Sequence, residues 1–61
     1  MMFKTGDRVE VTGIHRPQTY QVGDTGTVVS INRYKPNLIN VKLDGYKIPR
    51  FVIEDCELRT K

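Results

Sequence analysis

The apolar residues of this chain lie in short alternating runs, and Gly, Pro, Asn and Asp separate one run from the next. No stretch keeps a helical period for three turns, whereas alternation with a period of two is typical of strands that bury one face. The pattern therefore predicts an all-β fold with strands at residues 8–12, 26–31, 38–43 and 46–53. A single 3₁₀ turn and a brief closing strand at residues 57–59 are expected after them.

Two local signals predict how the third and fourth strands connect. Asp44-Gly45 is the strongest hairpin signal, because a type I′ turn needs positive φ at both central residues. A two-residue turn would place Lys42 directly opposite Lys47 on the outer face of the sheet. Pro49 cannot donate a ladder hydrogen bond, so it marks an edge, a bend or a bulge.

The alternation also predicts which side chains are buried. The expected core consists of Val9, Val11, Val28, Ile31, Ile39, Val41, Leu43, Ile48, Val52 and Leu58. A chain of 61 residues is near the lower limit for a domain that folds without staples. One cysteine and one histidine exclude an internal disulfide and a zinc cluster made of Cys and His alone. The chain must therefore close its core efficiently, or gain stability from a partner or from self-association.

Five short strands in meander order, with a 3₁₀ turn before the last one, predict a small SH3-like barrel. A single domain would span residues 1–61, with a long first loop at residues 13–24. Closure of the barrel would remove most exposed strand edges. The alternative is a five-stranded OB-like barrel. That fold usually has longer strands and often a helix after the third strand, for which Asp44-Gly45 leaves no room.

Two segments, GDRVEVTG (6–13) and VGDTGTVVSI (22–31), resemble the KOW-type, SH3-like modules of ribosomal proteins and transcription elongation factors. The resemblance covers residues 5–32, about half of the chain, and involves Gly6, Asp7, Val9, Val11, Gly23, Gly26, Val28 and Ile31. It implies an SH3-like fold and RNA binding. The extra residues from His15 to Tyr20 depart from the family's short loop, which argues against RNA binding through this loop. The remainder of the chain looks like small SH3-like adaptor subunits, such as the peripheral subunit of photosystem I, which dock on proteins.

The net charge of +3 is concentrated in one segment. Residues 31–50 contain five basic residues and one acidic residue, a net charge of +4, whereas residues 1–30 are neutral and residues 51–61 carry −1. This asymmetry indicates contact with a polyanion or an acidic protein. The predicted nucleic-acid-binding residues are Arg33, Tyr34, Lys35, Lys42, Lys47 and Arg50. The basic residues would contact phosphates, and the tyrosine would stack on an unpaired base.

These residues also have structural interpretations. Tyr34 could instead cap the open end of the barrel, and Tyr20 in the long loop presents the same choice. Lys42 and Lys47 would repel each other if directly paired, and a bound anion would relieve that repulsion. The alternative is that both lysines splay apart in water and protect an exposed sheet from aggregation.

No residue pattern indicates an enzyme, a cofactor or a metal site. His15 has no neighbouring carboxylate–nucleophile pattern, so a solvated loop histidine is expected. Cys56 lies between Asp55 and Glu57, whose charges raise a thiol pKa, and it is expected to be a small buried residue. Together with Glu54, these acids could bind a hard cation, but they are expected to form a solvated face.

The sequence therefore predicts a non-enzymatic binding module that contacts nucleic acid, RNA or DNA, through a basic face. The alternative is an SH3-like protein-interaction adaptor in a larger complex. No apolar run approaches the roughly 20 residues of a membrane span, and the chain opens without an apolar leader segment. A lone cysteine fits a reducing compartment. No membrane partner is expected, and the expected location is cytoplasmic.

Overall fold

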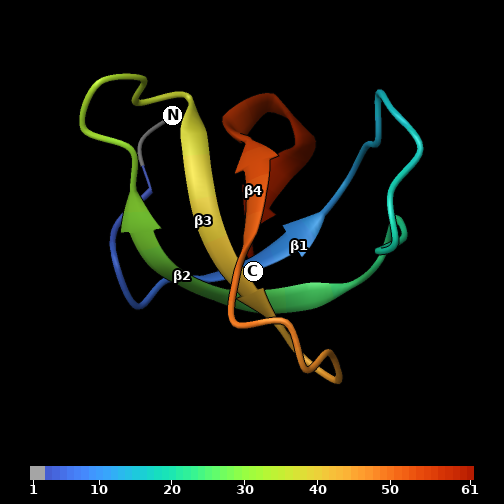
Figure 1. Ribbon diagram of the computed structural model, residues 1–61. Coiled ribbons are helices and arrows are strands. Elements are labelled where there is room, and N and C mark those ends of the chain that lie inside the picture. Colours follow the sequence, from blue (N-terminus) through green and yellow to red (C-terminus); the bar gives the residue numbers. More distant parts are fainter. Residues whose placement is uncertain (1–2) are drawn as a thin grey trace.

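The computed structural model describes residues 3–61 and is all-β, as predicted (Figure 1). Its strands are β1 (Arg8–Val11), β2 (Thr25–Ile31), β3 (Leu38–Leu43), β4 (Phe51–Glu54) and β5 (Leu58–Thr60). A 3₁₀ turn, η1 (Asp55–Glu57), lies between the last two strands, where the sequence predicts it. Within the described residues, no helix is long and apolar enough to cross a membrane.

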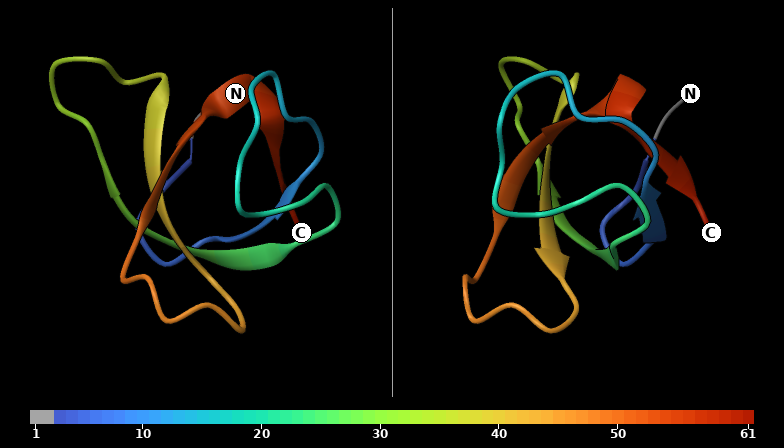
Figure 2. Two further views of the ribbon diagram at one scale, coloured as in Figure 1. Left: turned by 45° about the vertical axis from the view of Figure 1, so that its right-hand side comes forward. Right: turned by 90° about the vertical axis from the view of Figure 1, so that its right-hand side faces the viewer.

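All five strands belong to one antiparallel sheet with the order β4-β3-β2-β1-β5. β2 is the central strand. It pairs with β1 at its beginning and with β3 along nearly its whole length, and it curves strongly between them (Figure 1). Because η1 joins β4 directly to β5, the ends of the two edge strands come together. The sheet therefore curls round the core (Figure 2).

Gly26 lies where β2 is paired on both sides. It pairs with Val9 of β1 and with Leu43 of β3, and both of these side chains are completely buried. A Cβ atom on Gly26 would lie only 2.9 Å from the Cα of Leu43, and it would also overlap the carbonyl oxygen of Lys42. The missing side chain therefore lets β3 pass close to β2.

A β-bulge at Val29 bends β2 further. Val28 pairs with Val41 and Ser30 pairs with Asn40, so Val29 has no residue opposite it. A bulge of this kind bends its strand and increases the local twist. Val28 is buried and Val29 is exposed, while the side-chain amide of Asn40 donates a hydrogen bond to the hydroxyl of Ser30 (2.8 Å). The bulge thus places two consecutive residues of β2 on the outer face.

The core contains seven of the predicted residues: Val9, Val11, Val28, Ile39, Val41, Leu43 and Leu58. Ile31, also predicted, is partly buried and packs against them. Three further side chains are buried that the alternation did not identify: Phe3, Tyr20 and Ile53. The core therefore draws on the first loop and on the N-terminal segment as well as on the strands.

Two predicted core residues are wrong. Ile48 is 42% exposed and Val52 is 51% exposed. The register of β4 explains the second error, because Ile39 pairs with Ile53 and Asn40 pairs with Val52. Ile53 therefore faces inward beside Ile39, and Val52 faces outward. Ile48 lies before β4, in a loop that the sequence did not predict.

The connection between β3 and β4 is longer than predicted. Gly45 has the expected positive φ of 84°. Asp44 and Gly45 form a turn in which the N–H of Tyr46 donates to the carbonyl of Leu43 (3.4 Å), but Asp44 does not have positive φ, so the predicted type I′ turn is wrong. Since β4 begins only at Phe51, residues 44–50 form a loop and not a two-residue connection. The pairing of β3 with β4 ends before either lysine, and the predicted cross-strand pair of Lys42 with Lys47 is therefore wrong.

Aromatic packing explains this longer loop. Tyr46 turns inward and packs edge-on against Phe51, with ring centroids 5.3 Å apart. Its hydroxyl donates a hydrogen bond to Asp24 (2.6 Å), and its carbonyl accepts one from the Nζ of Lys42 (2.9 Å). Pro49 has no N–H group for a strand ladder. Tyr46 therefore anchors loop 44–50 to the core, and the chain resumes strand pairing only at Phe51.

The long loop between β1 and β2, residues 12–24, is anchored to the rest of the fold. The N–H of Thr12 donates a hydrogen bond to the carbonyl of Glu57 (2.8 Å). Tyr20 is buried, and its ring packs edge-on against Phe51 with a centroid distance of 5.2 Å. Tyr20 is therefore a core residue and not an exposed stacking ring.

We predict that Gly26→Ala lowers the free energy of unfolding by about 1–3 kcal/mol, because the added Cβ overlaps the backbone of β3. Gly13→Ala is the matched control, because a Cβ there meets no atom within 4 Å. At a position with compatible backbone, this substitution changes stability little or raises it by up to about 1 kcal/mol. Urea unfolding measures both variants, and equal destabilisation would contradict the close approach at Gly26.

Candidate nucleic-acid interface

The loop of residues 32–37 joins β2 to β3 and carries three of the predicted binding residues. The side chain of Asn32 holds it, because its Oδ1 accepts hydrogen bonds from the N–H groups of Tyr34 (2.9 Å) and Lys35 (2.8 Å). Asn commonly makes such bonds to the backbone that follows it. The N–H of Leu38 donates to the carbonyl of Lys35 (2.9 Å). The loop is thus already ordered, which reduces the entropy cost of binding.

Tyr34 extends from this loop into solvent and is 87% exposed. The interpretation that it caps the open end of a barrel is therefore wrong. Arg33 and Lys35 flank it in the chain, and both are exposed. An exposed ring between two cations can stack on an unpaired base while the cations neutralise neighbouring phosphates.

The other three predicted residues lie at the far end of β3. Lys42 is exposed near the end of the strand, and Lys47 and Arg50 are exposed in loop 44–50. Figure 1 shows loops 32–37 and 44–50 projecting from opposite ends of β3. A strand of six residues is about 20 Å long. The predicted residues therefore form two clusters, one at each end of β3, and not one continuous face.

Asp44, the single acidic residue of segment 31–50, is bound by a cation from outside that segment. The guanidinium of Arg8 donates to both of its oxygens, with Nη1 3.1 Å from Oδ1 and Nη2 2.5 Å from Oδ2. The hydroxyl of Thr25 also donates to Oδ2 (3.1 Å). These hydrogen bonds, above all those from Arg8, lower the pKa of Asp44 to about 2.

The positive charge of segment 31–50 is consequently left without a carboxylate partner. In the part of the chain that the structure describes, the other ion pairs join Arg59 to Glu10, and His15 to Glu54 and Glu57. None of the five basic residues of the segment takes part in an ion pair among these residues. The nitrogen of Lys42 donates to a neutral carbonyl, which leaves its charge in place.

A groove of about 390 Å³ lies beside the long loop. Its lining residues are His15, Arg16, Leu38, Val52, Glu54 and Glu57. Two carboxylates in this groove would repel a phosphate backbone. The groove is therefore a separate feature from the two basic clusters.

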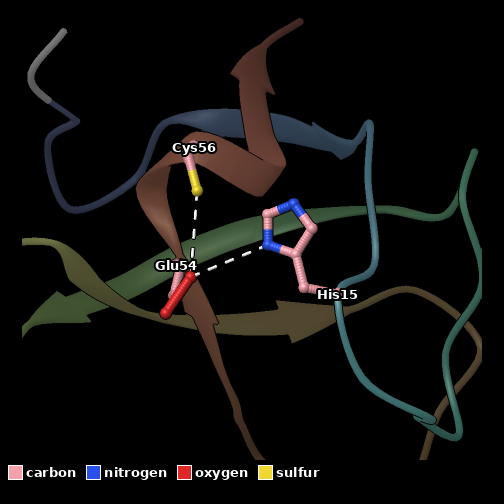
Figure 3. Close-up of side chains that lie close together, drawn as sticks. All are labelled: His15, Glu54 and Cys56. Carbon is pink, nitrogen blue, oxygen red and sulfur yellow. Dashed lines mark hydrogen bonds and ion pairs between the residues drawn. The ribbon is translucent and has the colours of Figure 1, made fainter.

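Two of the groove residues, His15 and Glu54, lie close to the thiol of Cys56, which is outside the groove lining (Figure 3). Cys56 is exposed and not buried as predicted. Desolvation, followed by the negative charges of Glu54 and Glu57, raises the pKa of its thiol, in the direction that the sequence predicts. A thiol that keeps its proton is a poor nucleophile, so the group offers no activated cysteine.

No local pattern of residues indicates the position of His15 in the fold. Its backbone N–H donates to Oε2 of Glu57 (2.8 Å), a residue 42 positions away in the chain. Its ring Nδ1 lies 3.4 Å from the same oxygen and 3.9 Å from Oε2 of Glu54. Only the folding of the long loop onto η1 brings these residues together.

Comparison of the chain with protein-family models, curated proteins and solved structures gives no match. The resemblance to KOW-type modules and to small adaptor subunits therefore stays a prediction. What the protein binds has to be inferred from the geometry and charge of the two basic clusters and of the groove beside the long loop.

The ion pair of Arg8 with Asp44 predicts an acid-dependent loss of stability. The folded pKa of Asp44 is about 2 and its ordinary value is 3.8, so folding favours the charged carboxylate. The stability contributed by this pair is complete above about pH 4 and is lost as the pH falls through about 2. Urea unfolding over this range should show a smaller loss of stability for Asp44→Asn than for the wild type.

The variant Arg8→Gln is the second arm of this experiment. It removes the cation and keeps the carboxylate, so its pH dependence should flatten in the same way. Stability curves of the wild type and both variants that run parallel between about pH 5 and pH 2 would contradict the assigned pKa.

Proposed function

We propose that this chain is a non-enzymatic module that binds single-stranded nucleic acid through loop 32–37. The observation that carries the proposal is the position of Tyr34. Its ring is 87% exposed, in a loop that Asn32 holds in place, between two cations without carboxylate partners among the described residues. Aromatic rings combined with a basic surface are typical of proteins that bind single strands.

Each part of this loop has a distinct task in the proposed complex. Tyr34 stacks on one unpaired base, and Arg33 and Lys35 contact the phosphates on either side of it. In a duplex the bases already stack on each other, so the ring has no free face to cover. Single strands are therefore preferred, and release of counterions makes the binding sensitive to salt.

The second basic cluster extends the contact. Neither β2 nor β3 carries an acidic residue, whereas Glu54 of β4 lies opposite Leu38 at the start of β3, so we place the bound strand over β2 and β3 and not over β4. A single strand that follows β3 for about 20 Å would reach from the first loop to Lys47 and Arg50. These residues add charge without contributing sequence recognition.

The fold is compatible with this proposal. We interpret the five-stranded sheet as an SH3-like barrel because of its strand order, its long first loop and the 3₁₀ turn before the last strand. The resemblance of residues 5–32 to KOW-type modules points to RNA as the natural ligand. The proposed contact uses the loop that follows this segment and not the long loop. The lone cysteine agrees with the predicted cytoplasmic location.

Substitutions at Tyr34 test the stacking contact. We predict that Tyr34→Ala weakens binding to a single-stranded oligonucleotide by about fivefold to a hundredfold, since stacking contributes about 1–3 kcal/mol per base. Tyr34→Phe keeps the ring and should bind like the wild type. Fluorescence anisotropy measures both, with a duplex of the same sequence as the second ligand. Equal effects of the two substitutions, or an equal loss on the duplex, would contradict stacking.

The salt dependence tests the phosphate contacts. The slope of log affinity against log salt concentration should be about −3, which corresponds to four phosphates at about −0.7 each. Lys35→Glu should weaken binding and reduce this slope by about 0.7–1. Lys61→Glu makes the same charge change at the far edge of the sheet and should leave the slope unchanged. No binding at low salt, or identical slopes for both variants, would contradict the proposed interface.

A protein-interaction adaptor is the second candidate, and the groove beside the long loop favours it. Leu38 and Val52 provide an apolar floor, and carboxylates lie next to them. A pull-down with and without nuclease separates the two functions. Retained nucleic acid supports the first candidate, whereas a nuclease-resistant partner that Val52→Asp releases supports the second.

A further inference from the structure

The long loop brings a histidine to the acidic turn that precedes β5. His15 comes from this loop, Glu54 ends β4, and Cys56 and Glu57 lie in η1. Two hydrogen bonds fix the approach: the N–H of Thr12 donates to the carbonyl of Glu57, and the N–H of His15 donates to its Oε2, both at 2.8 Å. The backbone of the loop therefore holds the imidazole against the turn.

Three of these residues, His15, Glu54 and Cys56, bring their side-chain donor atoms close together, and Glu57 lies beside His15. The Nδ1 of His15 lies 3.9 Å from Oε2 of Glu54 and 3.4 Å from Oε2 of Glu57. The sulfur of Cys56 lies 3.8 Å from Oε2 of Glu54. Zinc–ligand bonds of about 2.0–2.3 Å place neighbouring tetrahedral ligands about 3.3–3.8 Å apart. The three separations lie near this range, and the donor atoms of His15 and Cys56 lie within 4.8 Å of each other, so both side chains must rotate toward a bound ion.

Figure 3 shows the imidazole and the thiol approaching the Glu54 carboxylate from different directions. The donor atoms of His15, Glu54 and Cys56 all lie within 4.8 Å of one another. His15 and Cys56 are both exposed, so small rotations of their side chains can shorten the remaining distance. The ligand set thus needs no movement of the backbone.

The negative charge of Glu54 and Glu57 favours the binding of a cation beside His15. Among the described residues, Glu54 and Glu57 form ion pairs only with His15, and neither pairs with a lysine or an arginine. The side chain of Glu57 is only 8% exposed, and a buried carboxylate is costly without a compensating charge. Arg16 lines the same groove, but no ion pair with either glutamate is formed within the described chain. A bound metal ion would supply the missing positive charge.

We propose that His15, Glu54 and Cys56 bind one transition-metal ion of the Zn²⁺ class. Imidazole and thiolate donors select such ions over Mg²⁺ and Ca²⁺, which prefer oxygen ligands. Binding displaces the thiol proton of Cys56, which passes to solvent. With three protein ligands, water takes the fourth position of a tetrahedral ion, and Glu57, whose Oε2 lies 3.4 Å from the Nδ1 of His15, adds negative charge beside it. The ion ties the long loop to η1. The site is independent of the proposed nucleic-acid interface.

Titration with Co²⁺ under reducing conditions tests the site, because Co²⁺ occupies zinc sites and is coloured. The wild type should bind one ion, with a thiolate-to-cobalt charge-transfer band and the intense visible bands of four-coordinate Co²⁺. Zn²⁺ should displace it and Mg²⁺ should not. Cys56→Ser should lose the charge-transfer band, and His15→Asn should weaken Zn²⁺ binding about tenfold or more.

Asp55→Asn is the matched control. It removes a carboxylate from the same turn, but Asp55 is not among the clustered donors, so metal binding should stay unchanged. Zn²⁺ should also raise the thermal unfolding midpoint of the wild type and of this control, and do so much less for His15→Asn. The proposal is overturned if the wild type takes up no Zn²⁺, or if its Co²⁺ spectrum is six-coordinate. An equal loss of affinity in Asp55→Asn and His15→Asn would likewise overturn it, because it would indicate a diffuse acidic face.

Discussion

The absence of a side chain at Gly26 is the constraint on which the sheet depends. It lets β3 lie close to β2, and it leaves room for the completely buried side chains of Val9 and Leu43 on either side. Together with the bulge at Val29, this close contact bends β2, so that β1 and β3 can both pair with it while the sheet curls. A small chain without a disulfide can then enclose a core. The same curvature sets loops 32–37 and 44–50 at the two ends of β3 and brings the long loop onto η1.

The pairing of charges follows from this arrangement and determines what the surface can bind. Arg8 is on β1 and Asp44 follows β3, yet both lie next to the start of β2, where Thr25 joins their hydrogen-bond network. This pair removes the only negative charge of segment 31–50 and leaves its cations at the surface. The acidic residues Glu54 and Glu57 lie beside the long loop, and Glu54 also lies opposite Leu38 at the start of β3. Two regions of opposite charge therefore exist on one small domain, one suited to phosphates and the other to a metal ion.

Local patterns in the sequence predict most strands, the 3₁₀ turn and the positive φ of the glycine after β3, because each depends on neighbouring residues alone. The register of β4 cannot be predicted from neighbouring residues alone, because Val52 and Ile53 are adjacent and both apolar. Aromatic packing in the preceding loop decides which of the two faces inward. Tyr20 lies in a polar loop, and its burial depends on a distant partner. The contact of His15 with Glu57 spans 42 residues and has no local signal. The basic residues are evident from composition, and their division into two clusters follows from the length of β3, which separates loops 32–37 and 44–50.

The most direct test of the proposed interface is a ¹H–¹⁵N NMR titration with a short single-stranded oligonucleotide at low salt. If the interface is correct, the largest amide shifts will occur in residues 32–37, with a second set at Lys47 and Arg50. Amides that line the groove, including those of His15 and Val52, will change little. Shifts concentrated in the groove, or a spectrum that the oligonucleotide leaves unchanged, would contradict a nucleic-acid interface on this domain.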